Sequence, residues 1–171
     1  MAPDLYHSIF QTSAGWMGFL SSEVGVRRII LPRQSEKEVA TQLGENLAGA
    51  DSAPYHPRDL VDRFIAYFAG NVVTFPEQLD LPEATPFQLK VWEAARLIPF
   101  GQVKSYAWVA DKIGNPLAVR AVGQALGRNP VPIIVPCHRV VASGGGLGGF
   151  SGGLEMKKHL LGLEASASNG R

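Results

Sequence analysis

The stretch of the chain best suited to chemistry is Pro136-Cys137-His138-Arg139, which contains the only cysteine among the 171 residues. A free cysteine is usually a small buried hydrophobe, but a thiol beside a base or a positive charge loses its proton more easily. His138 is a candidate base for producing the nucleophilic thiolate. On an extended strand the two side chains would point to opposite faces, so their contact would need a turn or a bridging water. The motif predicts a nucleophilic cysteine, with Glu164 a candidate to orient the imidazole.

A glycine-rich segment follows this cysteine. Seven of the eleven residues 143–153 are glycine, and Phe150 and Ser151 stand near the end of the segment. Many glycines allow backbone groups to approach a ligand closely, although no strand-loop-helix pattern of a phosphate site frames this stretch. A floppy surface loop is the alternative. Because the segment lies so close to the cysteine in sequence, we expect it to form a pocket wall.

Two short helices are predicted before the cysteine, over residues 105–113 and 117–128, separated by Gly114-Asn115-Pro116. This outline is typical of a helix-turn-helix, although helical hairpins with no DNA role share it. The second helix is rich in small residues, and its long polar side chains are Arg120, Gln124 and Arg128. It therefore suits a close, sequence-tolerant approach, with Arg120 as the prominent probe, better than the reading of base edges. Burial of this helix through its alanines is the alternative.

The helices and strands that position these residues can be predicted from the spacing of apolar residues and from capping residues. Short β-rich runs at 5–11, 16–21 and 24–31 predict an antiparallel meander. A capping box at Ser35-Glu36-Lys37-Glu38, followed by Val39, Leu43 and Leu47, predicts one helix, and a second is expected at about 57–69. The apolar run 133–135 predicts a buried strand that leads into the cysteine.

A proline-flanked acidic stretch, residues 76–84, carries no helical or alternating pattern and is expected to be a linker. Thr85-Pro86-Phe87-Gln88 then restarts a helix with a capping box, and that helix should end near 99–101. We therefore predict a scaffold domain over 1–75, a linker over 76–84, a second domain over 85–165 and a flexible tail over 166–171.

Composition narrows the classes of function. One cysteine excludes an internal disulfide framework and a zinc site of several thiolates. No run of 18 apolar residues and no signal peptide is present, which predicts a soluble, cytoplasmic protein without a membrane partner. The net charge of +1 hides a division, because residues 1–84 carry 6 basic and 11 acidic side chains and residues 85–164 carry 9 and 4. Only the second half is expected to meet an anionic partner.

Several motifs together resemble the O6-alkylguanine-DNA alkyltransferases, also called methylated-DNA–protein-cysteine methyltransferases. They span about residues 85–164 in the family's order and spacing, and they are Ser105-Tyr106, Arg120-Ala121-Val122-Gly123, Asn129-Pro130, Pro136-Cys137-His138-Arg139-Val140 and Gly149-Phe150-Ser151-Gly152-Gly153. The N-terminal half is similar only in outline. The resemblance implies an α+β fold: an N-terminal ribonuclease-H-like antiparallel sheet with helices, then a mainly helical, winged helix-turn-helix domain.

The resemblance also implies a function, which is DNA repair by stoichiometric transfer of an alkyl group from O6-alkylguanine to Cys137 after the base is flipped out of the duplex. His138 would deprotonate the thiol through a water, and Glu164 would orient the imidazole. Asn129 would brace the turn that carries the cysteine. Tyr106 would press on the phosphate of the target nucleotide and donate a proton to the leaving guanine.

Further contacts are implied for substrate and DNA. Ser151 would hydrogen-bond O6, the carbonyls of Cys137 and Val140 would accept from the exocyclic amine, and Phe150 and Gly152 would complete the substrate site. Phe150 stands where the family often has tyrosine, which keeps the apolar wall but loses a hydroxyl. Arg120 would occupy the vacated base position, and the DNA-binding set would be Arg120, Tyr106, Ala121, Gln124 and Arg128.

The expected partner is double-stranded DNA that contains O6-alkylguanine, bound through its minor groove and largely independently of sequence. No cofactor and no metal are expected, and the protein should be a monomer in solution and nucleoid-associated in a prokaryote. The sequence leaves open the preferred alkyl size, O4-alkylthymine as a second substrate and cooperativity on DNA. Two other functions share part of this pattern: a damage sensor without chemistry, which the presence of Cys137 disfavours, and a cysteine hydrolase, which would need no helix-turn-helix.

Overall fold

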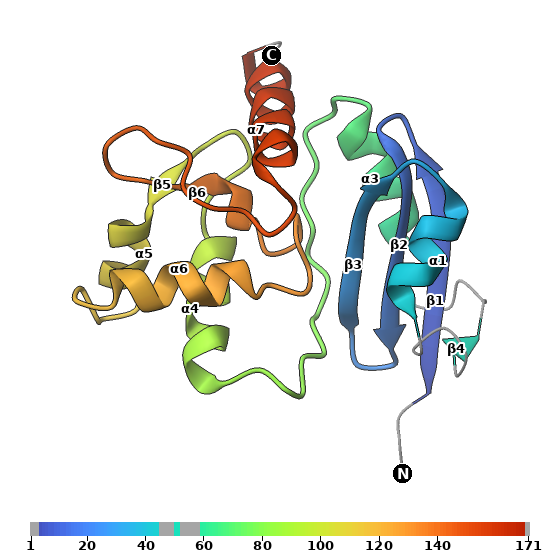
Figure 1. The fold of residues 1–171 in the computed structure, drawn as a ribbon, viewed down its shortest axis with the longest axis horizontal. Coiled ribbons are helices and arrows are strands. Elements are labelled where there is room, and N and C mark those ends of the chain that lie inside the picture. Colours follow the sequence, from blue (N-terminus) through green and yellow to red (C-terminus); the bar gives the residue numbers. More distant parts are fainter. Residues whose placement is uncertain (1–3, 45–49, 52–58, 170–171) are drawn as a thin grey trace. The chain divides into compact units, whose positions relative to one another are not determined.

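The computed structural model describes residues 4–44, 50–51 and 59–169. The chain divides into two compact units, Met1–Pro82 and Glu83–Arg171. In Figure 1 the first unit is blue to green and the second runs from green to red. Within the described ranges, none of the helices is long and apolar enough to cross a membrane.

The first unit is built on a four-stranded sheet in the order β3-β2-β1-β4 (Figure 1). Its first three strands form the predicted antiparallel meander, and they are β1 (Leu5–Thr12), β2 (Gly15–Ser22) and β3 (Val26–Arg33). A short fourth strand, β4 (Ala50–Asp51), pairs parallel to β1 and was not predicted.

One helix packs on each face of this sheet (Figure 1). Because side chains alternate along a strand, Phe19 and Leu20 point to opposite faces. Leu20 joins a core with Val39 and Leu43 of α1 (Glu36–Leu43). On the other face, Phe10 lies edge-on to Phe19 and stacks on Phe64 of α3 (Leu60–Phe68), each pair at 6.1 Å between ring centroids. Leu47 and residues 57–58, which were expected to be helical, lie outside the described residues.

The segment predicted as a linker is shorter than expected, because residues 76–80 pack on the first unit. The Val26 amide donates to the Gln78 carbonyl and the Asp80 amide to the Val26 carbonyl, both at 2.9 Å. The Asp80 carboxylate accepts from Ser22 Oγ at 2.5 Å and from Arg27 Nε at 2.7 Å. Since β3 ends the sheet order, its outer backbone groups need partners, and this patternless segment supplies them at Val26.

The second unit is mainly helical, and its helices are α4 (Pro86–Arg96), α5 (Tyr106–Lys112), α6 (Val119–Gly127), α7 (Leu154–Asn169) and the 3₁₀ turn η1 (Cys137–Arg139). Two short strands, β5 (Lys104–Ser105) and β6 (Val140–Val141), pair in parallel. The predicted capping box begins α4: Thr85 Oγ accepts from the Gln88 amide at 3.1 Å, and the Gln88 side chain accepts from the Thr85 amide at 3.0 Å. Trp92 Nε1 donates to the Ala125 carbonyl at 2.9 Å and ties α4 to α6.

Two sequence predictions for this unit are wrong. Residues 133–135 form no strand: Pro132 and Val135 make an isolated bridge around a turn in which Ile133 has a φ of 76°. Pro132 and Pro136, which flank this run, have no N–H and a fixed φ, so a strand ladder cannot continue beyond the run on either side. The predicted tail over 166–171 is instead helical as far as Asn169. The small residues of this stretch tolerate a helix, and Ser168 lies so close to Gly101 that a Cβ there would be 2.1 Å from its Oγ.

Candidate functional site

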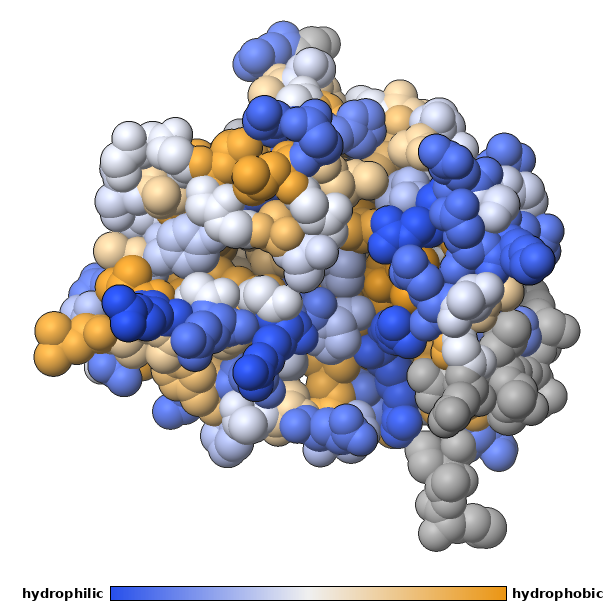
Figure 2. Space-filling model, in the orientation of Figure 1, coloured by the Kyte–Doolittle hydropathy of each residue, from blue (hydrophilic) through white to orange (hydrophobic). Residues whose placement is uncertain are grey.

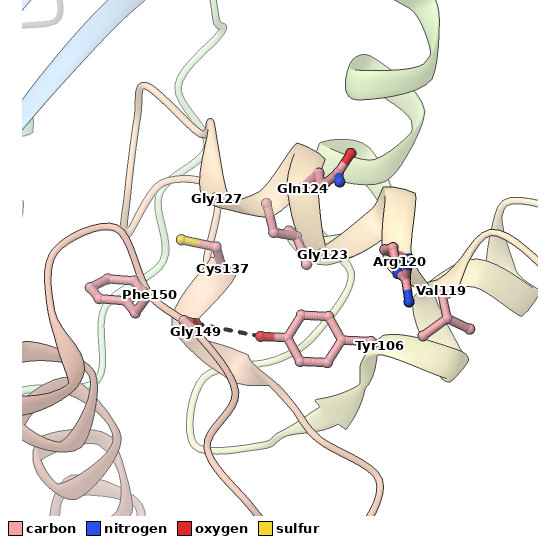
Figure 3. A pocket seen from close by; sticks show the side chains of 10 residues that line it. Tyr106, Val119, Arg120, Gly123, Gln124, Gly127, Cys137, Gly149 and Phe150 are labelled. Carbon is pink, nitrogen blue, oxygen red and sulfur yellow. Dashed lines mark hydrogen bonds between the residues drawn. The ribbon is translucent and has the colours of Figure 1, made fainter.

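Cys137 opens into a cavity of about 450 Å³ within the second unit (Figure 3). This volume is in the range of small-molecule sites. The walls come from the start of α5, from α6 and from the glycine-rich loop, and the lining residues are Tyr106, Val119, Arg120, Gly123, Gln124, Leu126, Gly127, Cys137, Gly149 and Phe150. The cavity therefore brings together five residues of the predicted site: Cys137, Tyr106, Arg120, Gln124 and Phe150.

Asn129 holds the turn that carries the cysteine. Its Oδ1 accepts from the Val131 amide at 2.9 Å, and its Nδ2 donates to the Val135 carbonyl at 2.9 Å and to Cys137 Sγ at 3.2 Å. Burial raises the pKa of the Cys137 thiol, whereas the hydrogen bond from Asn129 and the charge of Lys157 act in the opposite direction. One amide side chain thus fixes the position of the sulfur and also stabilises its negative charge.

His138, Arg139 and Glu164 form a buried network behind the cysteine. His138 Nε2 lies 2.5 Å from Glu164 Oε2. Arg139 Nε donates to Glu164 Oε1 at 2.8 Å, and its Nη2 donates to Oε2 at 3.2 Å. A third Arg139 nitrogen donates to the Ile98 carbonyl at 2.8 Å, and the Gly101 amide donates to Glu164 Oε1 at 3.0 Å. The cysteine lies on the turn η1 instead of an extended strand, and His138 is directed toward this network.

The charges in this network follow from burial and hydrogen bonding. Burial raises the pKa of Glu164, but hydrogen bonds and charges from His138 and Arg139 outweigh it and lower the pKa to about 2. Burial lowers the pKa of His138, and Glu164 only partly opposes that effect. Near neutral pH the site therefore holds a carboxylate, a guanidinium and a neutral imidazole. With Nε2 directed at Glu164, Nδ1 is the imidazole nitrogen that can accept a proton.

Tyr106 and the glycine-rich loop are closely packed. The Tyr106 hydroxyl donates to the Gly149 carbonyl at 3.4 Å (Figure 3). At Gly148, where φ is 72°, a Cβ would lie 2.4 Å from that hydroxyl oxygen, so only glycine fits. Burial raises the pKa of Tyr106, and the negative charge of a Cys137 thiolate raises it further, which keeps the phenol protonated. The loop is a wall of the cavity, as its position in the sequence predicted.

Helix α6 buries one face and exposes the other. Val122, Ala125 and Leu126 are buried, whereas Arg120, Ala121, Gln124 and Arg128 are exposed. Arg120 and Gln124 line the cavity, and Figure 3 draws them on the same helix above Tyr106. The alternative prediction, in which this helix is buried through its alanines, is therefore correct for Ala125 and wrong for Ala121.

The remaining predicted residues lie outside the cavity lining. Val140 is buried, Ser151 is exposed and Gly152 is half-buried, just after Phe150. Lys157 was not predicted as a site residue, and its ammonium is buried against the loop. The helical spacing of Lys157, Leu160 and Glu164 on the buried face of α7 is the signal that could have indicated it. Among the described residues, no three His, Cys, Asp or Glu side chains are grouped as a metal site.

Fold and site together define a helix-turn-helix protein with a single buried cysteine, backed by a histidine-glutamate-arginine network. Residues 86–166 match the family described as 6-O-methylguanine DNA methyltransferase, DNA binding domain. The methylated-DNA–protein-cysteine methyltransferase of Methanosarcina acetivorans is 39% identical over 163 residues, which are 95% of this chain and 99% of the relative. The chain therefore belongs to the methylated-DNA–protein-cysteine methyltransferase family, and this finding confirms the predicted family.

Other relatives agree with this assignment. The Mycobacterium tuberculosis protein of the same name is 52% identical over 106 residues, so the match spans 62% of this chain and 64% of that relative. The crystal structure of the Mycobacterium tuberculosis O6-methylguanine methyltransferase superposes with a TM-score of 0.77 at 36% identity, covering 95% of this chain and 94% of that one. A structure of the mycobacterial protein in complex with DNA has a TM-score of 0.78 at the same identity and coverage. These structures confirm the predicted fold class.

Proposed function

We propose that this protein repairs DNA by moving the alkyl group of O6-alkylguanine onto Cys137. The observation that carries the proposal is the placement of the thiol, which opens into a cavity lined by Arg120 and Gln124 of the second helix of a helix-turn-helix. The mycobacterial relative whose structure was solved in complex with DNA supports DNA as the partner. The family name supports a cysteine as the acceptor, and the sequence contains one cysteine.

The reaction is a displacement at the alkyl carbon. His138 takes the thiol proton through a water, the sulfur–carbon bond forms, and the carbon–O6 bond breaks with its electron pair left on the guanine. The guanine gains one proton, donated by Tyr106, as negative charge develops on the leaving base, and the proton held by His138 then returns to Tyr106 through water. A thioether has no good leaving group, so each molecule reacts once.

The base must leave the stack, because its reactive atom is otherwise shielded. Figure 2 shows strongly hydrophilic side chains along α6 and a hydrophobic projection where α5 leads into α6, a connection that contains Leu117 at 96% exposure. An arginine beside an apolar tip suits a minor groove, where both types of contact occur. Arg120 then occupies the space that the flipped base has left. In this proposal the protein acts as a monomer.

Intact mass measurement tests this function. The protein is incubated with a duplex that contains one O6-methylguanine, weighed and digested. We expect a gain of one methyl group on the peptide with Cys137, saturating at one equivalent, and no gain for Cys137→Ala. Tight binding without a mass change would identify a damage sensor instead, and repeated turnover of an ester or amide would identify a hydrolase.

A further inference from the structure

Lys157 is a fully buried lysine that the proposed mechanism does not use. It lies in the first turns of α7, and its side chain is 0% exposed. Its ammonium donates to the carbonyls of Val140 at 2.8 Å, of Gly149 at 3.1 Å and of Leu147. A lysine has three N–H donors, so these carbonyls use all of them. Every donor is directed at the backbone around the cavity.

The three carbonyls belong to two segments that the lysine joins. Val140 begins β6, directly after the turn η1 that carries Cys137, whereas Leu147 and Gly149 belong to the glycine-rich loop. The ammonium also lies 5.8 Å from the centroid of the Tyr106 ring. One side chain therefore fixes the distance between the cysteine turn and the opposite wall of the cavity.

Its charge lacks the usual partner. Among the ion pairs of the described residues, none includes Lys157. A buried ammonium with only neutral carbonyls around it is costly. The pKa of Lys157 is lowered by burial, and the negative charge of Cys137 opposes that effect. Among the described residues, the Cys137 thiolate is an anion whose charge acts on this cation, and it exists only while the protein is unalkylated.

We propose that Lys157 is a positioning residue of the transfer reaction: it holds the glycine-rich loop against the cysteine turn and supplies the positive charge that balances the Cys137 thiolate. The proposal rests on the proposed function for its substrate. The relation between lysine and thiol, however, can be measured without that substrate. Lys157 touches neither the thiol nor the alkyl carbon in this scheme and acts through the backbone and the electric field.

The experiment compares Lys157→Gln, which removes the charge, with Lys158→Gln as the matched control. Lys158 is the next residue of the same helix, its side chain is 60% exposed, and it forms an ion pair with the exposed Glu155 at 3.6 Å. Iodoacetamide labelling, followed by intact mass from pH 5 to pH 10, reports the thiolate fraction of the single cysteine. Reaction with free O6-benzylguanine over the same range reports alkyl transfer without DNA.

We expect Lys157→Gln to move the acid limb of both pH profiles upward by about one pH unit, which corresponds to about a tenfold loss of rate at pH 7. Lys158→Gln should leave both profiles unchanged, and affinity for undamaged duplex should stay within about twofold for both variants, because α6 is untouched. Lys157→Arg, which keeps the charge, should recover the position of the pH profile.

Thermal unfolding of each variant separates this role from simple support of the fold. A lower melting temperature with unmoved pH profiles would overturn the proposal, as would an equal loss of rate at every pH. Should Lys157→Gln fail to fold, Lys157→Arg decides: a wild-type profile supports the proposal and a shifted one contradicts it. If wild-type protein takes no methyl group from O6-methylguanine DNA, the proposed function fails, while the iodoacetamide profiles still test the lysine.

Discussion

At the scale of single residues, the charges of the site depend on Glu164. Its two carboxylate oxygens accept from His138, Arg139 and the Gly101 amide, so a change at this one position affects all three. An ionised Glu164 keeps the Nε2 of His138 as a donor, which leaves the other ring nitrogen as the base. The same carboxylate compensates the buried guanidinium of Arg139.

Acid should therefore destabilise the second unit in two steps. The pKa of His138 is lowered on folding, so its contribution to stability is complete above about pH 6.5 and is lost as the pH falls. The pKa of Glu164 is lowered from 4.5 to about 2, so its contribution is complete above about pH 4.5 and is lost as the pH approaches 2. The second step is worth on the order of 3 kcal/mol. Urea unfolding at pH 7, 5, 3 and 2 measures how the free energy of unfolding falls over both steps.

A control identifies the carboxylate responsible. Glu164→Gln should flatten the dependence below pH 4.5 while lowering stability at pH 7, because Arg139 loses its counter-charge. Glu155→Gln, which changes an exposed carboxylate on the same helix, should reproduce the wild-type dependence. An unchanged acid limb in Glu164→Gln would show that another group is responsible.

Asn129 offers a second test at this scale. Asn129→Asp keeps the acceptor for the Val131 amide but loses the donors to Val135 and Cys137, and it adds a negative charge beside the sulfur. We expect slower alkylation near neutral pH and a stability loss of about 1–3 kcal/mol. Asn129→Ala loses all three contacts and should be less stable still. O6-benzylguanine kinetics and urea midpoints provide both readouts.

At the scale of elements, α6 presents an exposed face that carries Arg120 and Gln124. Helix α4 supports α6 from the buried side through the hydrogen bond from Trp92 to the Ala125 carbonyl. Helix α4 itself begins at the Thr85–Gln88 capping box. Arg120 and Arg128 lie on the exposed face but at different places, because Arg120 lines the cavity and Arg128 follows the last turn. They should therefore contribute differently to activity.

Arg120→Ala should slow repair of duplex DNA far more than reaction with free O6-benzylguanine, since only the duplex has a vacated base position to fill. Arg128→Ala, a phosphate contact in the proposed complex, should instead weaken binding to all duplexes and reduce the slope of log affinity against log salt by about 0.9. Single-turnover rates and salt titrations separate the two. Equal losses on both substrates for Arg120→Ala would contradict its role.

The capping box can be tested separately. Thr85→Ala removes the acceptor for the Gln88 amide and should cost about 0.5–2 kcal/mol of unfolding free energy. Thr85→Ser retains the hydroxyl and should cost much less. Urea midpoints at neutral pH provide the measurement, and equal midpoints for the two variants would mean that the cap contributes nothing.

The elements also show how far sequence patterns reach. The meander and most of the helix positions were predictable, because alternation and capping residues are local signals. The turn at Ile133 was not, since an apolar run looks the same in a buried strand and in a proline-braced turn. Cys137 and His138 were predicted from their types and adjacency, and the structure places the cysteine at the cavity and the histidine against Glu164. Lys157 was missed because a lysine's burial depends on carbonyls of two other segments, which no local pattern reveals.

At the scale of the whole molecule, the first half of the chain is acidic and the second half is basic. Burial lowers the number of these charges that a partner can reach. Of the nine basic residues in 85–164, Arg139 and Lys157 are buried, and of the four acidic residues Glu164 is buried. Seven basic and three acidic side chains remain to meet a partner. Duplex binding should therefore weaken steadily between about 50 and 200 mM salt, while reaction with free O6-benzylguanine stays constant. A salt-independent duplex affinity would contradict a phosphate-facing surface.

The segment 76–80 that packs along β3 has a consequence for solubility. An edge strand with open backbone groups is a template on which a second chain can pair. Here the chain covers part of that edge itself. The amide and the carbonyl of Val26 are both hydrogen-bonded to the segment, and the Asp80 side chain accepts hydrogen bonds from Ser22 and Arg27. Damage to this stretch, by proteolytic nicking or by Asp80→Ala, would thus first appear as aggregation in concentrated solution, before any loss of chemistry at the cysteine.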